Sequence, residues 1–187
     1  MPAILFLLAF GVGVYGYGSI FFEQTPVQAS RATYAICGPN PFPESIAVAE
    51  YIRKHSKKED KIAVLGSEAQ IYFYSKRQSA APYIYTYQMM ETEPYAPRMQ
   101  REMVEEIERS RPAYLVFVNV FASWLVRPKS ERLLFRWFEE YATREFDLVG
   151  VVDILSETRT EYRWDRGTVG YVPRSPHFLW IFKRKNA

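Results

Sequence analysis

The sequence predicts an α/β protein with three layers: a mostly parallel, Rossmann-like sheet, helices on both faces, and antiparallel strands at its C-terminal edge. Continuous apolar runs, typical of strands buried on both faces, alternate with segments of helical periodicity. Such alternation favours parallel strands joined by helices. Toward the C-terminus it gives way to a hairpin and a last strand. An uncharged run over residues 1–22 also predicts one transmembrane helix ahead of the sheet.

The N-terminal run, MPAILFLLAFGVGVYGYGSIFF, is apolar throughout and has aromatic residues near its end, as at a membrane surface. About 20 residues rising 1.5 Å each span a bilayer core of roughly 30 Å. The alternative is a signal peptide cleaved after Val27-Gln28-Ala29, although no Lys or Arg precedes the run. We therefore expect a protein of the cell membrane. Its soluble domain is expected on the exoplasmic (periplasmic) side, because no positive cluster follows the span.

Residues 23–43 are expected to form a linker, because they hold four prolines together with glycine and asparagine. The soluble α/β domain is expected over residues 44–187. It begins with a helix from Ser45 to His55, where apolar residues recur close to a period of 3.6. Basic residues follow as far as Lys58. They suit either phosphate-bearing lipids or the negative end of the helix dipole, and we favour the dipole.

Ile62–Leu65 is a short apolar run that predicts the first buried strand. Gly66 then makes a turn. Ser67 and Gln70 have the spacing of a capping box, with Ser67 as the N-cap, which predicts a short helix ending near Ser75.

Tyr83, Tyr85 and Tyr87 alternate with non-aromatic residues, and this period of two predicts a second strand. A helix begins at Pro97, with an apolar stripe on one face and opposite charges four residues apart on the other. The next segment, Tyr114–Val118, is fully apolar and predicts another buried strand.

The last third of the chain continues the alternation. A helix is predicted from Ser130, as its cap, to about Thr143. A strand follows over Phe146–Leu155, with Thr160–Trp164 as its antiparallel hairpin partner. Phe178–Phe182 predicts the final strand.

Composition argues against several classes of function. The net charge is +3, spread over mixed-sign positions, and no nucleic-acid-reading motif is present, so no nucleic-acid partner is expected. The single cysteine, Cys37, allows no internal disulfide and has no neighbouring base to activate it. The two histidines, His55 and His177, lie far apart without partners at ligand spacing. No metal site and no cofactor are therefore predicted.

The turn Gly66-Ser67-Glu68 is the strongest candidate for a ligand site, because it follows a strand and opens a helix. Open α/β sheets bind ligands there, and helix amides favour anions. The predicted ligand-binding residues are Ser67, Glu68, Tyr85 and Tyr87. No G-x-G-x-x-G, Walker or G-x-S-x-G sequence occurs, so no catalytic residue is assigned. The capping box is the structural alternative for Ser67.

Four stretches occur in order along the chain: NPFPESIAVAEYI, VLGSEAQIYFYSKRQSA with YIYTY, RPAYLVFVNVFASWL and FDLVGVVDI. Together with the apolar run before them, they resemble the C-terminal soluble region and last membrane span of bacterial GT-C-type membrane glycosyltransferases. These enzymes are similar to dolichyl-phosphate-mannose–protein mannosyltransferases. The resemblance covers nearly the whole chain and implies a polyprenyl-phosphate-linked sugar as donor.

In that family a catalytic carboxylate lies in the first exoplasmic loop. This chain has no acidic pair after its apolar run, where Glu23 stands alone, so no catalytic residue is carried over. The resemblance implies an exoplasmic, non-catalytic domain that assists acceptor or partner recognition beside the rest of a membrane transferase. The alternative is a membrane-anchored interaction or ligand-binding module with no enzymatic role.

Overall fold

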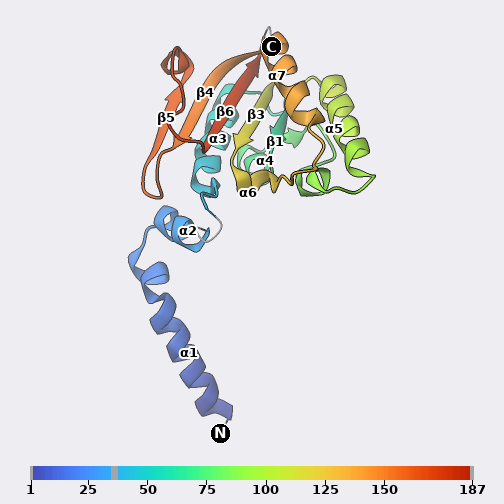
Figure 1. Ribbon diagram of the computed structural model, residues 1–187. Helices are drawn as coiled ribbons and strands as arrows, with labels where there is room; N and C mark the ends of the chain where they lie inside the picture. The colour runs from blue at the N-terminus through green and yellow to red at the C-terminus, as the bar shows by residue number, and fades with distance from the viewer. Residues whose placement is uncertain (1, 35–37, 186–187) are drawn as a thin grey trace.

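The computed structural model describes residues 2–34 and 38–185, so Cys37 lies outside the described residues. An α/β domain is built on a six-stranded sheet, and a long helical arm projects from it (Figure 1). The strands are β1 (Lys61–Leu65), β2 (Gln78–Ser79), β3 (Tyr114–Asn119), β4 (Phe146–Ile154), β5 (Thr160–Trp164) and β6 (Phe178–Arg184). The α/β class is therefore confirmed.

The sheet is mixed, with the strand order β2-β1-β3-β6-β4-β5. β1 pairs in parallel with β2 and β3, whereas β6 is antiparallel to β3 and β4, and β5 is antiparallel to β4. The prediction of a mostly parallel sheet is thus wrong. The sheet is mixed because β6 lies between β3 and β4, antiparallel to both, and not at an edge. Leu179 and Ile181 are fully buried on one face of β6, while Trp180 and Phe182 pack on the other.

The domain contains five α-helices in its described part. They are α3 (Phe42–His55), α4 (Gln70–Ser75), α5 (Ala96–Ser110), α6 (Phe121–Trp124) and α7 (Leu133–Glu145). Two 3₁₀ turns, η3 (Tyr87–Met90) and η4 (Asp165–Thr168), complete it. The helices expected near Ser45, Pro97 and Ser130 are confirmed within a few residues, and so are the strands other than the tyrosine-rich one.

Helices cover both faces of the sheet, which gives the expected three layers. Val116 and Val118 of β3 belong to a buried cluster with α3 and α4. Leu115 and Phe117 alternate with them and belong to a second cluster with α5 and α7. Such alternation follows from the strand period of two, so an apolar run such as β3 feeds both cores at once.

The strand predicted over residues 83–87 is wrong. β2 pairs with β1 only through Gln78 and Ser79. The Ser79 hydroxyl then donates to the Ala81 carbonyl at 2.6 Å, and Pro82 has no amide hydrogen to continue the ladder. The tyrosines therefore follow in an irregular segment that leads into η3.

The arm contains α1 (Pro2–Gly18), the π-helical turn η1 (Ser19–Glu23) and α2 (Pro26–Tyr34). The large apolar side chains of α1 are between 41% and 92% exposed. Over residues 2–34 and 38–185, no helix combines the length and the apolar character needed to cross a membrane. The α-helical geometry of α1 ends at Gly18 after 17 residues. The fold therefore does not support the transmembrane helix expected over residues 1–22.

The expected linker, residues 23–43, contains α2, and α2 is attached to the domain. Its Arg31 forms an ion pair with Glu44, a fully buried residue in the first turn of α3. The Arg31 guanidinium also donates to the Thr160 hydroxyl of β5 at 2.9 Å, and that hydroxyl donates to the Glu44 carboxylate at 2.6 Å. The ion pair and the Thr160 hydroxyl thus join the arm, α3 and the edge strand β5.

Candidate functional site

The carboxyl ends of β1 and β3 form a topological switch point. From β1 the chain passes through α4 to β2 on one side, and then through α5 to β3 on the other side. α4 and α5 lie on opposite faces of the sheet, so the carboxyl ends of β1 and β3 have the arrangement at which open α/β sheets bind ligands. Gly66 turns the chain there with φ +152°, and an added Cβ would lie 2.9 Å from Val118 Cβ.

Four polar side chains lie at this point of the sheet and are nearly closed off from solvent. They are Ser67, Glu68, Thr86 and Ser123, which we call the switch-point cluster. The Ser67 hydroxyl donates to the Ser123 carbonyl at 2.7 Å and accepts the Thr86 amide hydrogen at 3.2 Å. The Thr86 hydroxyl donates to the same carbonyl at 2.9 Å. The cluster therefore ties the turn after β1, the tyrosine-rich segment and α6 together.

Glu68 is the titratable member of the cluster. Its Oε1 accepts a hydrogen bond from the Ser123 hydroxyl at 2.5 Å, whereas its buried Oε2 has no hydrogen-bond partner within the described chain. Burial raises the pKa of Glu68 to about 7, against the opposing effect of hydrogen bonds from Ser123 and from backbone amides. The carboxyl can therefore gain or lose a proton near neutral pH, but it is only 5% exposed.

Tyr85 and Tyr87 flank the buried Thr86, and both point outward. Their rings stack with centroids 6.1 Å apart. The structure therefore brings all four predicted site residues to one edge of the sheet, with Ser67 and Glu68 inside and the tyrosines outside. Ligand binding by these residues stays a prediction.

The predicted N-cap role of Ser67 is wrong. α4 begins at Gln70, follows Ala69 and has no side-chain hydrogen bond at its N-cap. The Gln70 amide donates to the Ser45 hydroxyl of α3 at 3.1 Å instead of closing a capping box. The Ser67 hydroxyl instead forms hydrogen bonds with Thr86 and Ser123, which are distant in the sequence, so it stabilises tertiary contacts and not the start of a helix.

Sequence reasoning missed Ser123 and the short helix α6 that carries it. Trp124, the next residue, anchors α6 by donating from its indole nitrogen to the Val118 carbonyl at 2.7 Å. The one signal was an isolated serine inside the apolar run VFASWL. A buried hydroxyl needs a hydrogen-bond partner, but that rule does not say which residue supplies it.

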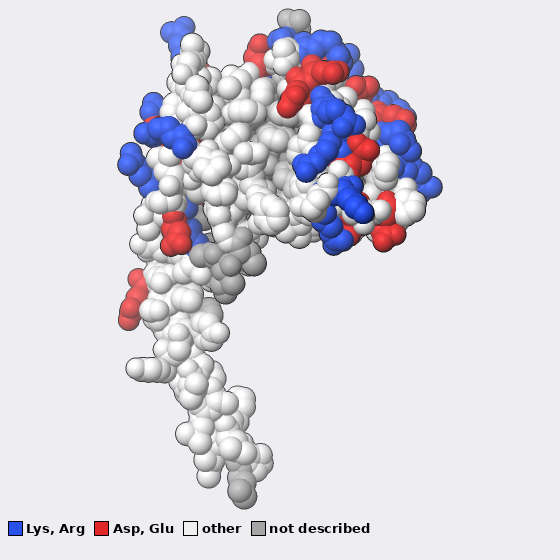
Figure 2. All heavy atoms as spheres, in the orientation of Figure 1, with Lys and Arg blue, Asp and Glu red and all other residues white. Residues whose placement is uncertain are grey.

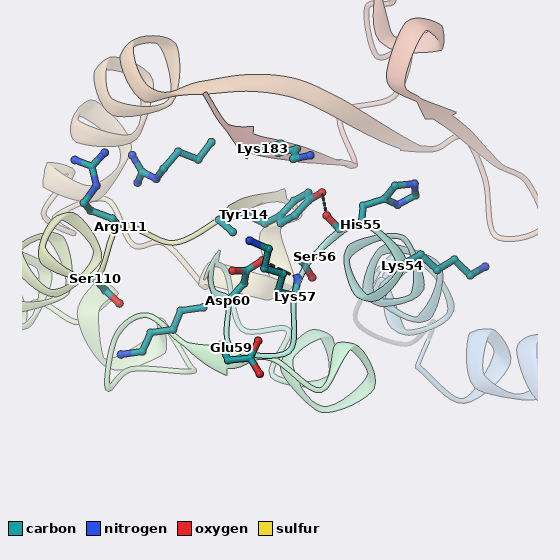
Figure 3. A pocket seen from close by; sticks show the side chains of 13 residues that line it. Lys54, His55, Ser56, Lys57, Glu59, Asp60, Ser110, Arg111, Tyr114 and Lys183 are labelled. Carbon is teal, nitrogen blue, oxygen red and sulfur yellow. Dashed lines mark hydrogen bonds between the residues drawn. The ribbon is translucent and has the colours of Figure 1, made fainter. Parts of the chain in front are cut away.

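A cavity of about 740 Å³ lies at the opposite, amino-terminal ends of β1 and β3. Its lining includes Lys54, Arg111 and Lys183, and Figure 3 shows Lys54 and Arg111 extending in opposite directions. α3 and α5 both end here, so these cations complement the negative ends of two helix dipoles. This placement favours the dipole interpretation of the basic residues over a phosphate site, since two helix C-termini repel an anion.

In the part of the chain that the structure describes, no group of three or more His, Cys, Asp and Glu side chains is placed to hold a metal ion. Compared with protein-family models, curated proteins and solved structures, the chain gives no match. The resemblance to membrane glycosyltransferases therefore stays a prediction from the sequence.

Proposed function

We propose that this chain is a membrane-attached, non-catalytic accessory domain of a membrane glycosyltransferase that uses a polyprenyl-phosphate-linked sugar. Its role is to assist recognition of the acceptor or of a partner on the exoplasmic side. The transferase part of the proposal rests on the sequence resemblance. The membrane part rests on α1, and the non-catalytic part on the closed switch-point cluster.

The uncovered apolar surface of α1 is the observation that carries the proposal. The helix has no buried residue, and residues 2–22 contain no charge. Each large apolar side chain moved out of water contributes about 1.5–3 kcal/mol, and α1 gains none of this from the domain. Its 17 residues rise about 26 Å, and η1 continues the helical path to Glu23. A bilayer core of roughly 30 Å provides the missing apolar environment.

The enclosure of Glu68 supports a non-catalytic role. A general acid or base must come within hydrogen-bond reach of the reacting group. Glu68 has a suitable pKa, about 7, but Ser67, Thr86 and Ser123 fill the space around it. A substrate would reach the carboxyl only after α6 or the tyrosine-rich segment had moved.

Charges placed in the middle of α1 test the membrane attachment. We expect the chain to stay in the membrane fraction after carbonate extraction, and Leu8→Arg/Val12→Arg to reduce that fraction more than tenfold. Each Arg at a helix centre opposes insertion by about 2.5–3.5 kcal/mol. Val169→Arg/Val172→Arg, at exposed apolar positions of the domain, is the matched control and should change nothing. Recovery of the unsubstituted chain in the soluble fraction would disprove the attachment.

Two further observations test the transferase role. The reading frame upstream of Met1 is expected to encode additional apolar spans and an acidic first loop. The purified 187-residue chain is expected to transfer no sugar from a polyprenyl-phosphate donor, because its one raised-pKa carboxyl among the described acidic residues is enclosed. Transfer by this chain alone would overturn the non-catalytic assignment, and a promoter directly upstream would favour an independent module.

A second candidate function is a membrane-anchored ligand-binding module. A cavity of about 330 Å³ lies between residues 38–40 and the end of β4, and His177 lines it. The Nδ1 atom of His177 is buried and has no hydrogen-bond partner in the described structure. A ligand that raises the melting temperature of the chain, but not that of His177→Phe, would favour this module.

A further inference from the structure

The carboxyl end of the parallel strands carries an exposed apolar surface next to the switch-point cluster. It consists of Tyr85, Tyr87, Phe121 and Leu125, which are 47%, 37%, 66% and 47% exposed, and we call it the aromatic edge. The Leu125 amide donates to the Phe121 carbonyl at 2.9 Å, so these two residues lie at the two ends of the single turn of α6.

A buried hydrogen bond connects the two segments that carry the aromatic edge, one with the tyrosines and the other with Phe121 and Leu125. Thr86 lies between the two tyrosines, Ser123 lies between Phe121 and Leu125, and both are buried. The Thr86 hydroxyl donates to the Ser123 carbonyl at 2.9 Å. The bond brings the two segments together, so the exposed Tyr85 and Tyr87 and the exposed Phe121 and Leu125 lie on adjoining segments at this edge.

The aromatic edge lies on the side of the domain from which the arm projects. Gln70, at the start of α4, bonds to Ser45 in the first turn of α3, so α3 begins at this edge. Arg31 of α2 attaches to Glu44 at the same end of α3. In Figure 1, α1 and α2 extend from the side of α4 and α6, whereas the C-terminus lies at the far end.

The charged side chains of the domain are distributed unevenly around the aromatic edge. Figure 2 shows blue and red side chains gathered over α5 and α7, while the visible surface over α6 is white. The basic cavity with Lys54, Arg111 and Lys183 lies at the opposite end of the sheet. The aromatic edge is thus an uncharged patch at an end that also carries the Arg127–Glu91 ion pair, whereas the basic cavity lies at the opposite end.

We propose that the aromatic edge rests in the interfacial region of the bilayer that holds α1. Tyrosine suits this layer because its ring is apolar and its hydroxyl stays hydrated, and Phe and Leu add apolar area. Lipid is the occupant that the fold favours, because the attached arm holds this edge close to the membrane surface. The domain then sits with the carboxyl ends of its parallel strands toward the lipid. This inference rests on the proposed membrane attachment.

Site-directed spin labelling of the full chain in phosphatidylcholine–phosphatidylglycerol vesicles tests the docking. The single cysteine is replaced by Cys37→Ser, and one label is attached at Phe121→Cys, Val12→Cys or Arg109→Cys. The expected ratio of oxygen to nickel-chelate accessibility at position 121 is severalfold above that at position 109, at the far end of α5. Position 12 is expected to show the highest ratio.

The labels separate the failure of docking from the failure of attachment. If position 12 reads as hydrocarbon while position 121 equals position 109, the docking is disproved and the membrane attachment stands. If positions 12 and 121 both read as water, the proposed attachment itself fails. A label at Leu125→Cys repeats the measurement, should Phe121→Cys not fold.

Substitutions within the edge provide a second readout. Tyr85→Ser/Tyr87→Ser is expected to lower the accessibility ratio at position 121 at least twofold toward the value at position 109. Val169→Ser/Val172→Ser removes two exposed apolar side chains elsewhere and is expected to leave the ratio unchanged. An equal effect of both pairs would mean that the ratio does not depend on the aromatic edge, and would contradict the inference.

Discussion

At the residue scale, Glu68 shows how a fold can hold a carboxyl group in an unusual state. One carboxylate oxygen accepts a hydrogen bond from Ser123, while the other is buried without a partner in the described structure. Desolvation of the ionised form outweighs the hydrogen bonds that favour it, and the pKa rises from 4.5 to about 7. The folded state therefore binds a proton more tightly than the unfolded chain does.

This difference makes the stability depend on pH. The contribution of protonated Glu68 is fully present below pH 4.5 and is lost as the pH rises to and through 7, because the unfolded chain ionises first. A rise of about 2.5 units corresponds to roughly 3 kcal/mol. For Glu68→Gln, which cannot ionise, we expect the free energy of unfolding relative to the unsubstituted chain to increase by roughly 3 kcal/mol between pH 4.5 and pH 8.

Urea unfolding in detergent at a series of pH values measures this difference. The control is Glu91→Gln, which alters an exposed ion pair with Arg127 and should shift the curve by less than about 1 kcal/mol. Parallel pH curves for Glu68→Gln and the unsubstituted chain would show that folding does not raise the pKa of Glu68.

At the element scale, the sequence predicts elements whose signal is local. β1 and β3 contain continuous apolar runs, β4 is rich in valine, and α5 has one apolar stripe, so their residues specify them without reference to the rest of the chain. The apolar composition of β6 was equally clear, but its place in the sheet was not. The hydrophobic period marks a segment as a strand but does not say which strands it pairs with.

The candidate site was predicted in its position but not in its contacts. A strand followed by Gly66 and a helix was enough to locate the turn at the switch point. The hydroxyl of Ser67 could not be assigned correctly, because a local cap and a long-range bond to Ser123 both satisfy it. The strand prediction for the tyrosine-rich segment was wrong for a related reason. Its period of two is typical of a strand, but Pro82 cannot continue the ladder and Thr86 bonds to Ser123, so the segment is irregular.

The attachment of α2 gives a prediction at the same scale. In Arg31→Met, the fully buried Glu44 carboxylate loses its positive partner, and removal of one member of a buried ion pair destabilises a protein by about 3–5 kcal/mol. Arg31 is partly exposed, so we expect about 3 kcal/mol by thermal or urea unfolding. Arg31→Met/Glu44→Gln, which removes both charges, should recover at least half of the loss. An unchanged stability in Arg31→Met would show that α2 is not held by this pair.

At the scale of the whole molecule, the two helices of the arm differ in whether they contact the domain. α1 has no buried residue, so it depends on its surroundings and contributes no packing to the domain. α2 is bound to the domain through Arg31, Glu44 and Thr160. The boundary between the unpacked part of the arm and the part attached to the domain therefore lies before α2, within the segment expected to be a linker.

Two truncations test this boundary. Removal of residues 1–24 deletes α1 and η1 but keeps α2, so the melting temperature of the domain should stay within about 2 °C of the full chain. Removal of residues 1–40 also deletes Arg31 and leaves Glu44 buried without its cation, and the loss of about 3 kcal/mol should lower the melting temperature by roughly 6–12 °C at about 2–4 °C per kcal/mol. Calorimetry or circular dichroism measures both. Equal melting temperatures would place the boundary after α2, whereas a large loss on removing residues 1–24 would mean that α1 supports the domain directly.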